Sequence, residues 1–354
     1  MNKTISLSAV PLLTIAIPTW NRARYLEENL AQLHAQLVKM QPGSVEILVS
    51  DNCSSDSTME VVECARKIGL PIRYVRNETN VGWALNFAQC FDLANGKYVL
   101  LLGDDDLIVD DALPLLLDRL ARKNYGVVCL RPFGFDADFR RENPGGTGRE
   151  RVFQQADQFL VKISRYFTLT SACVLNKSLL TGVDSKQFIS TDLATFHLLL
   201  RAALAASENL FIEKYFIASK RQNSFSYEYS SVFVGQLWTI IDAHVPFGLS
   251  RKAVRTIERD KLFCYYPFYM LDLRLSGRGD LKSTYKAFDD RFHDRWIFKY
   301  WLAPVIRLPR PLAIVWGVAA TVIGRIANGD VRRGVKFAWS KLVRLLGLAR
   351  SIQN

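Results

Sequence analysis

Three adjacent carboxylates follow an apolar run in the first third of the chain. Asp104, Asp105 and Asp106 come directly after Gly103, and residues 98–102 before that glycine are all apolar or aromatic. Such a run is typical of a buried parallel strand, and open α/β sheets bind ligands at the carboxyl ends of their strands. A few hard carboxylate oxygens suit Mg²⁺ or Mn²⁺, which complete their coordination with water and substrate phosphates. The alternative is that these acids cap a following helix.

Two other polar loops follow expected strands. The apolar segments 12–17 and 45–50 run into the polar segments 18–22 and 51–56, and an amphipathic helical pattern follows each. Alternating strand and helix patterns predict βαβ units in a parallel sheet, whose strands all end at one edge. We therefore expect both loops to lie beside the acid cluster. Residues 131–151 are expected to form a loose loop.

In these segments the chain resembles the family 2 glycosyltransferases, which have the GT-A fold. The matching motifs are Ile15 to Arg22, Glu46 to Thr58, Asn80 to Asn86 and Ala94 to Asp106. The resemblance covers roughly residues 12 to 225, and it is greatest to bacterial O-antigen enzymes of the abequosyltransferase type. It implies an α/β fold with a mostly parallel central sheet, a nucleotide-sugar donor, a divalent cation, and displacement with inversion at the anomeric carbon.

The resemblance also implies roles for individual residues. The first loop surrounds the nucleotide base, the acid after the second strand accepts a hydrogen bond from the base, and the acid cluster serves ribose and metal. The expected donor-binding residues are Pro18, Thr19, Asn21, Arg22, Asp51, Asn80, Gly82, Asp104 and Arg221, and the expected metal ligands are Asp105 and, directly or through water, Asp106. From the residues alone, Asp51 is equally well explained as a turn residue.

Asp192 is the candidate catalytic base. An inverting transfer needs a base that takes the proton from the acceptor hydroxyl. Asp192 matches the Asp of the family's Glu-Asp motif, although Thr191 replaces the Glu. Alternatively, Asp192 caps the helix expected from about Leu193, and a helix N-terminus would lower its pKa and weaken it as a base.

Two further positions bear on the donor site. Arg221 lies in a basic, hydroxyl-rich loop, where a guanidinium could clamp a diphosphate through paired hydrogen bonds. The alternative is an ordinary solvated charge. At Gly103, many members of the resembled family carry the first Asp of an Asp-x-Asp-Asp run, but the carboxylates expected to bind the metal are retained here.

The positive charge is concentrated at the C-terminal end. The net charge is +12, and residues 295–354 hold eleven Lys or Arg and one acid, Asp330. This favours an anionic surface as the partner of that end, whereas the aromatic and basic spacing of an RNA-binding sheet is missing, so we expect no nucleic acid partner. Six cysteines without a C-x-x-C pair indicate free thiols in a reducing compartment. We expect no secretory signal at the N-terminus.

The longest uncharged stretch lies within this basic end. Pro311 to Gly324 comprises fourteen mostly apolar residues, whereas a helix that crosses a bilayer needs about 20. With the basic helix expected over residues 331–350, the stretch predicts a membrane anchor lying in the plane of the bilayer surface. The alternative is an amphipathic helix packed on the main domain.

Together these features predict a two-part chain. Residues 1–230 are expected to form the GT-A domain, with a nucleotide-binding half over about 10–130 and an acceptor half over about 131–230. Residues 231–354 are expected to form a helical region with a basic, membrane-associating segment.

The predicted function is a metal-dependent (Mg²⁺ or Mn²⁺) inverting hexosyl- or deoxyhexosyltransferase. It would add one sugar to a polyprenyl-diphosphate-linked oligosaccharide or polysaccharide, in O-antigen or other surface glycan synthesis, at the cytoplasmic face of the membrane. The Gln-x-x-Arg-Trp signature of processive synthases is missing, which favours single additions. Two alternatives remain: sugar-phosphate nucleotidyltransfer, whose Gly-rich N-terminal loop is missing, and a non-catalytic peripheral membrane scaffold whose acid cluster binds a structural cation.

Overall fold

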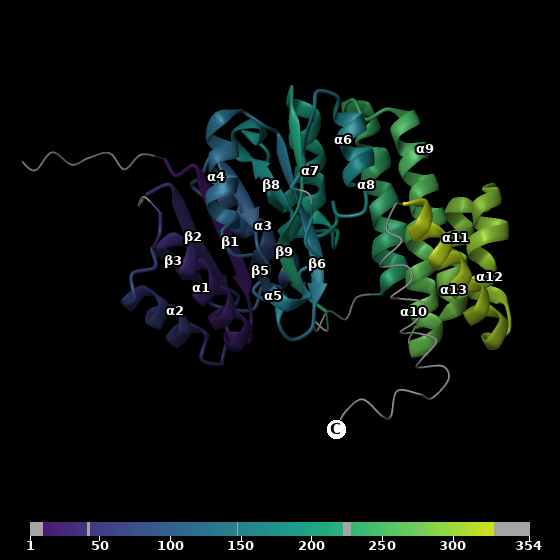
Figure 1. The fold of residues 1–354 in the computed structure, drawn as a ribbon, viewed down its shortest axis with the longest axis horizontal. Helices are drawn as coiled ribbons and strands as arrows, with labels where there is room; N and C mark the ends of the chain where they lie inside the picture. Colours follow the sequence, from purple (N-terminus) through teal and green to yellow (C-terminus); the bar gives the residue numbers. More distant parts are fainter. Residues whose placement is uncertain (1–9, 41–42, 147, 222–227, 278, 329–354) are drawn as a thin grey trace, which may run out of the picture. The chain divides into compact units, whose positions relative to one another are not determined.

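A computed structural model describes residues 10–40, 43–146, 148–221, 228–277 and 279–328. Contacts divide the chain into two compact units, residues 1–226 with 242–250 and residues 227–241 with 251–354. Figure 1 labels their helices and strands. The first unit is a sheet with helices packed on it, and the second is helical in its described residues.

The sheet of the first unit contains β1 Leu13–Thr19, β2 Val45–Asp51, β3 Ile72–Arg76, β4 Tyr98–Leu101, β5 Asp106–Ile108, β6 Val127–Phe135, β7 Glu150–Phe153, β8 Cys173–Asn176 and β9 Asn209–Lys220. In the described residues its order is β3-β2-β1-β4-β8-β6-β9-β5, with β7 paired to β9. Strands β1 to β4 are parallel, and β8 is antiparallel to both β4 and β6. The loops after β1, β2 and β4 therefore share one edge.

The helices of this unit are α1 Ala23–Leu37, α2 Thr58–Lys67, α3 Trp83–Leu93, α4 Ala112–Arg122, α5 Phe139–Glu142, α6 Ala156–Ile163 and α7 Ala194–Ala205. Shorter 3₁₀ turns are η1 Thr170–Ala172, η2 Lys177–Leu180, η3 Ser185–Phe188 and η5 Val245–Phe247. Helix α1 contacts α2 and α4, whereas α3 contacts α7, and α7 contacts α6. The sheet thus lies between two layers of helices, as expected for an α/β fold.

Alternation along the strands explains these layers. Leu13, Ile15 and Ile17 of β1 are fully buried in one core with the leucines of α1, which are Leu26, Leu30 and Leu33. Every second residue of a strand points to the same face, so the residues between them face α3. A helical repeat on α1 and an alternating repeat on β1 therefore fix which sides meet.

One local expectation and one local alternative were wrong. Residues 131–151 are not a loose loop, because β6 extends to Phe135 and α5 and the start of β7 fall in this segment. The acid cluster does not cap a helix either: a backbone hydrogen bond from Asp106 to Gly103 closes a turn, and Asp106 begins strand β5.

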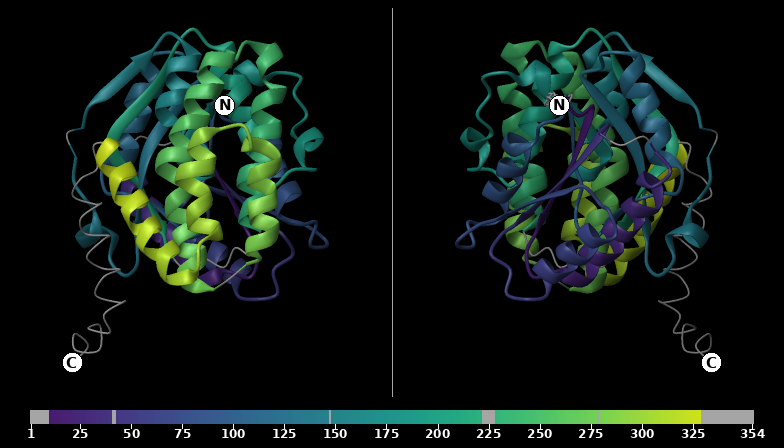
Figure 2. Two further views of the ribbon diagram at one scale, coloured as in Figure 1. Left: turned by 90° about the vertical axis from the view of Figure 1, so that its right-hand side faces the viewer. Right: turned by 90° about the vertical axis from the view of Figure 1, so that its left-hand side faces the viewer.

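The second unit consists of α9 Arg251–Asp260, α10 Tyr266–Ser276, α11 Leu281–Phe292, α12 Ala303–Arg307 and α13 Arg310–Ala327, with π-helical turns η4 Ser231–Gln236, η6 Lys261–Tyr265 and η7 Phe298–Leu302. Helix α8, Leu237–Ala243, crosses the boundary between the units. Figure 2 shows these helices from two sides. Buried aromatic rings fill this unit, with Tyr266 packed edge-on against Phe288.

Helix α13 is longer than the uncharged stretch predicted from the sequence, because it includes Arg310 and Arg325. Its eighteen residues make it the one described helix long and apolar enough to cross a membrane, by length and composition. The basic helix expected over residues 331–350 lies outside the described residues.

Candidate active site

The acid cluster lies in the turn between β4 and β5. Asp104, Asp105 and Asp106 are 3%, 6% and 4% exposed, so all three carboxylates are largely withdrawn from water. The amide of Gly103 donates to Ser171 Oγ at 2.9 Å, which ties the turn to η1. A Cβ on Gly103 would lie 3.2 Å from Asp105 Oδ1 and from Asp106 Oδ2. Two carboxylate oxygens thus flank the glycine, where a larger residue would crowd them.

Asp106 is held more firmly than its neighbours. It pairs with Ser219 of β9 in the sheet, and hydroxyl groups of Ser171 and Ser219 bond its carboxylate. Burial raises its pKa, and the charge of Asp105 adds to the rise. Neither serine stood out in the sequence, because Ser219 reaches the cluster through the pairing of β9 with β5, and Ser171 through the turn η1 that contacts β4.

Arg22 is the cation that faces this cluster. Its guanidinium lies 3.1 Å from Asp104 Oδ1 and 2.6 Å from Asp105 Oδ2, and its Nε is buried without a hydrogen-bond partner. Asp104 also accepts from Thr19 Oγ1 at 2.8 Å. Burial nevertheless raises the pKa of Asp104 to about 7, since Arg22 lowers it less than burial and the neighbouring acids raise it. One guanidinium does not fully compensate three buried acids.

The first loop is shaped by hydrogen bonds to the loop after β2. Asn21 has a positive φ of 52°, and its backbone N–H donates to Ser54 Oγ at 2.9 Å. Its side-chain oxygen accepts from the amide of Ser55 at 2.7 Å. Asparagine tolerates this left-handed conformation better than most residues. Pro18, which ends the apolar part of β1, pairs with Ser50 in the parallel register.

Asp51 is buried, and protein groups surround its carboxylate. It accepts from Tyr74 Oη at 2.6 Å and from the amide of Ser54 at 2.9 Å, and Arg76 Nε lies 3.4 Å away. The pKa of Tyr74 is raised by burial and by this hydrogen bond. The sequence did not single out Tyr74 or Arg76. In this structure the hydrogen bonds of Asp51 hold together the loops around the position expected for the nucleotide base.

Asn80 and Gly82 lie in a network of amide side chains. Asn80 Oδ1 accepts from Asn52 Nδ2 at 2.7 Å and from the amide of Gly82 at 2.9 Å. Asn52 Oδ1 accepts in turn from Asn77 and from the amide of Val81. The loop before α3 is therefore fastened to the end of β2, at the same edge as the acid cluster.

Arg221 follows β9 two residues after Ser219, so it lies near the acid cluster. Its guanidinium bonds Asp136 at 2.5 Å and Glu142 at 3.0 Å, with a further bond to the carbonyl of Gly134. Binding a diphosphate through Arg221 would require these acids to share it.

Asp192 lies two residues before α7, whose N-cap is Leu193. The far end of α7 is at Gly126, where a Cβ would lie 2.4 Å from the carbonyl oxygen of Ala202. Gly126 precedes β6, at the edge of the sheet opposite the acid cluster. Helix α7 rises about 18 Å over twelve residues, so Asp192 lies at the end of α7 away from Gly126.

The oxygen atoms of the acid cluster are ligands that suit a small hard cation. Carboxylate oxygens dominate, the cluster is buried, and its negative charge exceeds that of Arg22. No group of three or more His, Cys, Asp or Glu side chains in the described part of the chain is arranged to hold a metal alone. A cation here would complete its coordination with water or with a bound molecule, as Mg²⁺ usually does with waters and substrate phosphates.

Comparison with known proteins identifies this architecture. Residues 14–182, which contain the three polar loops and the acid cluster, match the model of glycosyl transferase family 2. The expected fold, a GT-A-like α/β unit followed by helices, is thereby confirmed.

Among similar proteins, the abequosyltransferase RfbV of Salmonella typhimurium is 40% identical over 121 residues, 34% of this chain and 36% of that protein. The GalNAc(5)-diNAcBac-PP-undecaprenol beta-1,3-glucosyltransferase of Campylobacter jejuni is 31% identical over 184 residues, 51% of this chain and 55% of that protein. The matched segments thus span about a third to a half of these relatives.

The fold is also similar to that of S. aureus TarS 1-349. The complex with UDP has a TM-score of 0.58 at 16% identity, covering 90% of this chain and 91% of that one. The complex with UDP-GlcNAc has a TM-score of 0.56 at 15% identity, covering 90% and 92%.

Proposed function

We propose that this protein is an inverting, metal-dependent glycosyltransferase that moves one sugar from a nucleotide-sugar donor to a lipid-linked glycan acceptor in bacterial surface glycan synthesis. The observation that supports it most is the convergence of the loops after β1, β2 and β4 at one sheet edge, around a buried acid cluster and within a family 2 domain. The name of the Campylobacter relative includes a polyprenyl diphosphate, which supports the acceptor class.

In this proposal each loop binds a different part of the nucleotide-sugar donor. Thr19, Asn21 and the Asp51 network form the base pocket, while Asp104 serves the ribose. Asp105, aided by Asp106, would hold Mg²⁺ or Mn²⁺, which would neutralise the charge developing on the leaving nucleoside diphosphate. Pro18, Asn80 and Gly82 complete the donor loops, and Arg22 and Arg221 provide positive charge for the diphosphate.

The acceptor side depends on Asp192. The acceptor hydroxyl attacks the anomeric carbon, the bond from that carbon to the diphosphate breaks, and Asp192 takes the hydroxyl proton. We place residues 10–130 in nucleotide binding and residues 131–230 in acceptor binding. We also place the enzyme on the cytoplasmic membrane surface, where a polyprenyl-linked acceptor would be presented.

Binding of nucleotide tests the donor site first. Thermal unfolding of the full chain with UDP, GDP, CDP or dTDP, with and without Mn²⁺, should show a shift for at least one nucleotide that depends on Mn²⁺, because a ligand of the native state raises its stability. Asp105→Asn should abolish this shift and the transfer activity. Asp118→Asn, which changes a half-buried acid on α4 that pairs with Arg119 and Arg122, is the matched control.

The competing scaffold hypothesis gives a different result. A structural cation site would show stabilisation by the cation alone, no response to any nucleotide, and no transfer of sugar. That combination would reject the glycosyltransferase proposal.

A further inference from the structure

Helix α13 has its large apolar side chains on the outside. Leu312, Val315, Trp316, Ile323 and Ile326 are between 38% and 70% exposed. Their spacing of three, four or seven residues places them on one side of the helix, which we call the outward stripe. An ordinary surface helix would carry polar residues on this side.

The opposite side of α13 carries small residues that pack inside the helical unit. They are Ala313, Gly317, Ala320, Thr321 and Gly324. A Cβ on Gly317 would lie 3.1 Å from side-chain atoms of Leu271 and Val305, and one on Gly324 would lie 2.9 Å from Cys264 Cα. The helix is therefore fixed against α10, α12 and η6, and it could not cross a bilayer without leaving them. Within residues 310–328, the outward stripe is the apolar surface of α13 that is exposed to a partner.

Amphipathic aromatic residues lie in the segment before α13, which contacts Trp316. Trp316 Nε1 donates to the carbonyl oxygen of Trp301 at 2.9 Å, and the two rings are 6.1 Å apart. Tyr300, next to Trp301 in the chain, is 71% exposed, and Trp296, one turn earlier, is 66% exposed. Tryptophan and tyrosine are enriched where a protein meets the lipid headgroups, because one end of each ring system is apolar and the other is polar.

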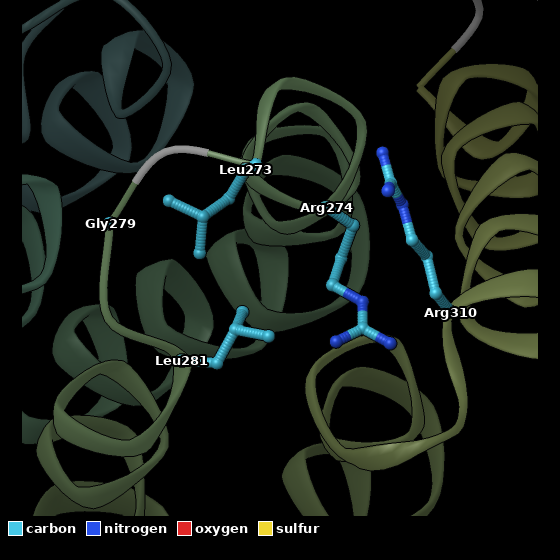
Figure 3. A pocket seen from close by; sticks show the side chains of 6 residues that line it. Leu273, Arg274, Gly279, Leu281 and Arg310 are labelled. Carbon is cyan, nitrogen blue, oxygen red and sulfur yellow. The ribbon is translucent and has the colours of Figure 1, made fainter.

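The surrounding charge is positive. Residues 295–328 contain five Lys or Arg and no acid. At the start of α13, Arg274 and Arg310 line a hollow of about 140 Å³ with Leu273, Gly277, Gly279 and Leu281, and none of these six residues is acidic (Figure 3). Arg310 and Arg325 lie near the two ends of α13, where they would attract anionic lipid phosphates.

We propose that the outward stripe of α13, with Trp296 and Tyr300, is the surface that enters the headgroup layer of an anionic membrane, with the helix lying in the membrane plane. This surface would be the part of the protein that contacts lipid when the enzyme is bound to the membrane surface. The inference therefore rests on the membrane location given in the proposed function. It does not depend on the acid cluster or on the donor.

The test is co-sedimentation of the full chain with phosphatidylcholine vesicles that either contain or lack phosphatidylglycerol. Val315→Glu combined with Ile323→Glu should lower partitioning onto the anionic vesicles about tenfold or more, because both side chains lose their apolar contact with lipid. Met59→Glu with Ile68→Glu is the matched control, since these exposed apolar residues of the first unit undergo the same charge change. This control should bind within about twofold of wild type.

A second variant separates apolar contact from charge. Val315→Gln with Ile323→Gln removes the apolar surface without adding negative charge, and it should also lose most binding. Far-ultraviolet circular dichroism and thermal unfolding verify that each variant is folded.

Three results would overturn the inference: wild type that does not sediment with anionic vesicles, equal losses in the α13 variants and the Met59/Ile68 control, or a dimer that the Val315/Ile323 variants dissociate without any vesicle binding. The nucleotide-dependent thermal shift is measured on the same proteins. If that shift persists while lipid binding fails, the membrane surface is wrong and the donor site stands; the reverse result rejects the donor site alone.

Discussion

Replacement of Arg22 by glutamine should destabilise the protein and at the same time strengthen its binding of Mn²⁺. The guanidinium contacts the two carboxylates Asp104 and Asp105, whose side chains are 4% and 5% exposed. Arg22 supplies positive charge at carboxylates to which a metal would also bring positive charge. Arg22 and the cation should therefore compete for the same carboxylates.

The size of the effect follows from burial. Removing one partner of a buried ion pair costs about 3–5 kcal/mol. The Arg22 side chain retains 18% exposure, and Asp104 can take up a proton readily because its pKa is already about 7. Both facts reduce the penalty, so we expect a loss of about 2–3 kcal/mol in the free energy of unfolding for Arg22→Gln at neutral pH.

The assay is Mn²⁺ binding without nucleotide, followed through the electron paramagnetic resonance signal of free Mn²⁺. Because the metal no longer displaces an arginine, its dissociation constant should fall about tenfold, which corresponds to about 1.4 kcal/mol. Arg24→Gln, a nearby arginine whose side chain is 89% exposed, is the control and should change neither quantity. Unchanged stability, or Mn²⁺ binding that is equal or weaker in Arg22→Gln, would refute the reasoning.

Three further substitutions test other parts of the fold. Tyr74→Phe should lower the free energy of unfolding by about 1–2 kcal/mol in urea titrations, because buried Asp51 loses a hydrogen bond; no loss would mean that Asp51 does not need this bond. Gly126→Ala should cost more than about 2 kcal/mol, since its Cβ would lie 2.4 Å from the rigid carbonyl of Ala202, and wild-type melting would contradict that contact. Burial lowers the pKa of Lys261 from 10.5 to about 7, so the unfolded chain binds more protons between these values and stability should rise with pH across this window. Lys261→Met should remove up to about 5 kcal/mol of that rise, and pH profiles that remain parallel would exclude a buried lysine.

Local patterns predicted the elements of the first unit well where repeats were strong. Leu26, Leu30 and Leu33 do form the buried side of α1, and the apolar run 98–102 contains β4. Strand β5 was not predicted, because Asp106 belongs to a short strand whose partner, Ser219, lies more than a hundred residues later. A three-residue strand has no repeat of its own, and only its pairing with β9 defines it.

The sequence predicted the loops that form the candidate site but not the residues that hold these loops in place. The sequence motifs indicated the three loops, and the structure brings their residues Thr19, Ser54 and Asp104 within one hydrogen-bonded arrangement around Asn21 and Arg22. Ser171, Tyr74 and Arg76 carry no motif, since common residue types gain their role only through their position in the fold. Hydropathy alone also could not predict which side of α13 faces outward, because a count of apolar residues does not show which side of a helix packs against the protein.

The different anchoring of the three acids has a consequence for protein engineering. Residues 103–105 lie in a turn, whereas Asp106 is built into a sheet through β9. A chimaera that takes only the turn from another transferase would keep the strands β4 and β5 on either side of it. A graft whose crossover point falls after Asp106 would also have to import the matching segment of β9, or it would separate the acid from the serine with which it pairs.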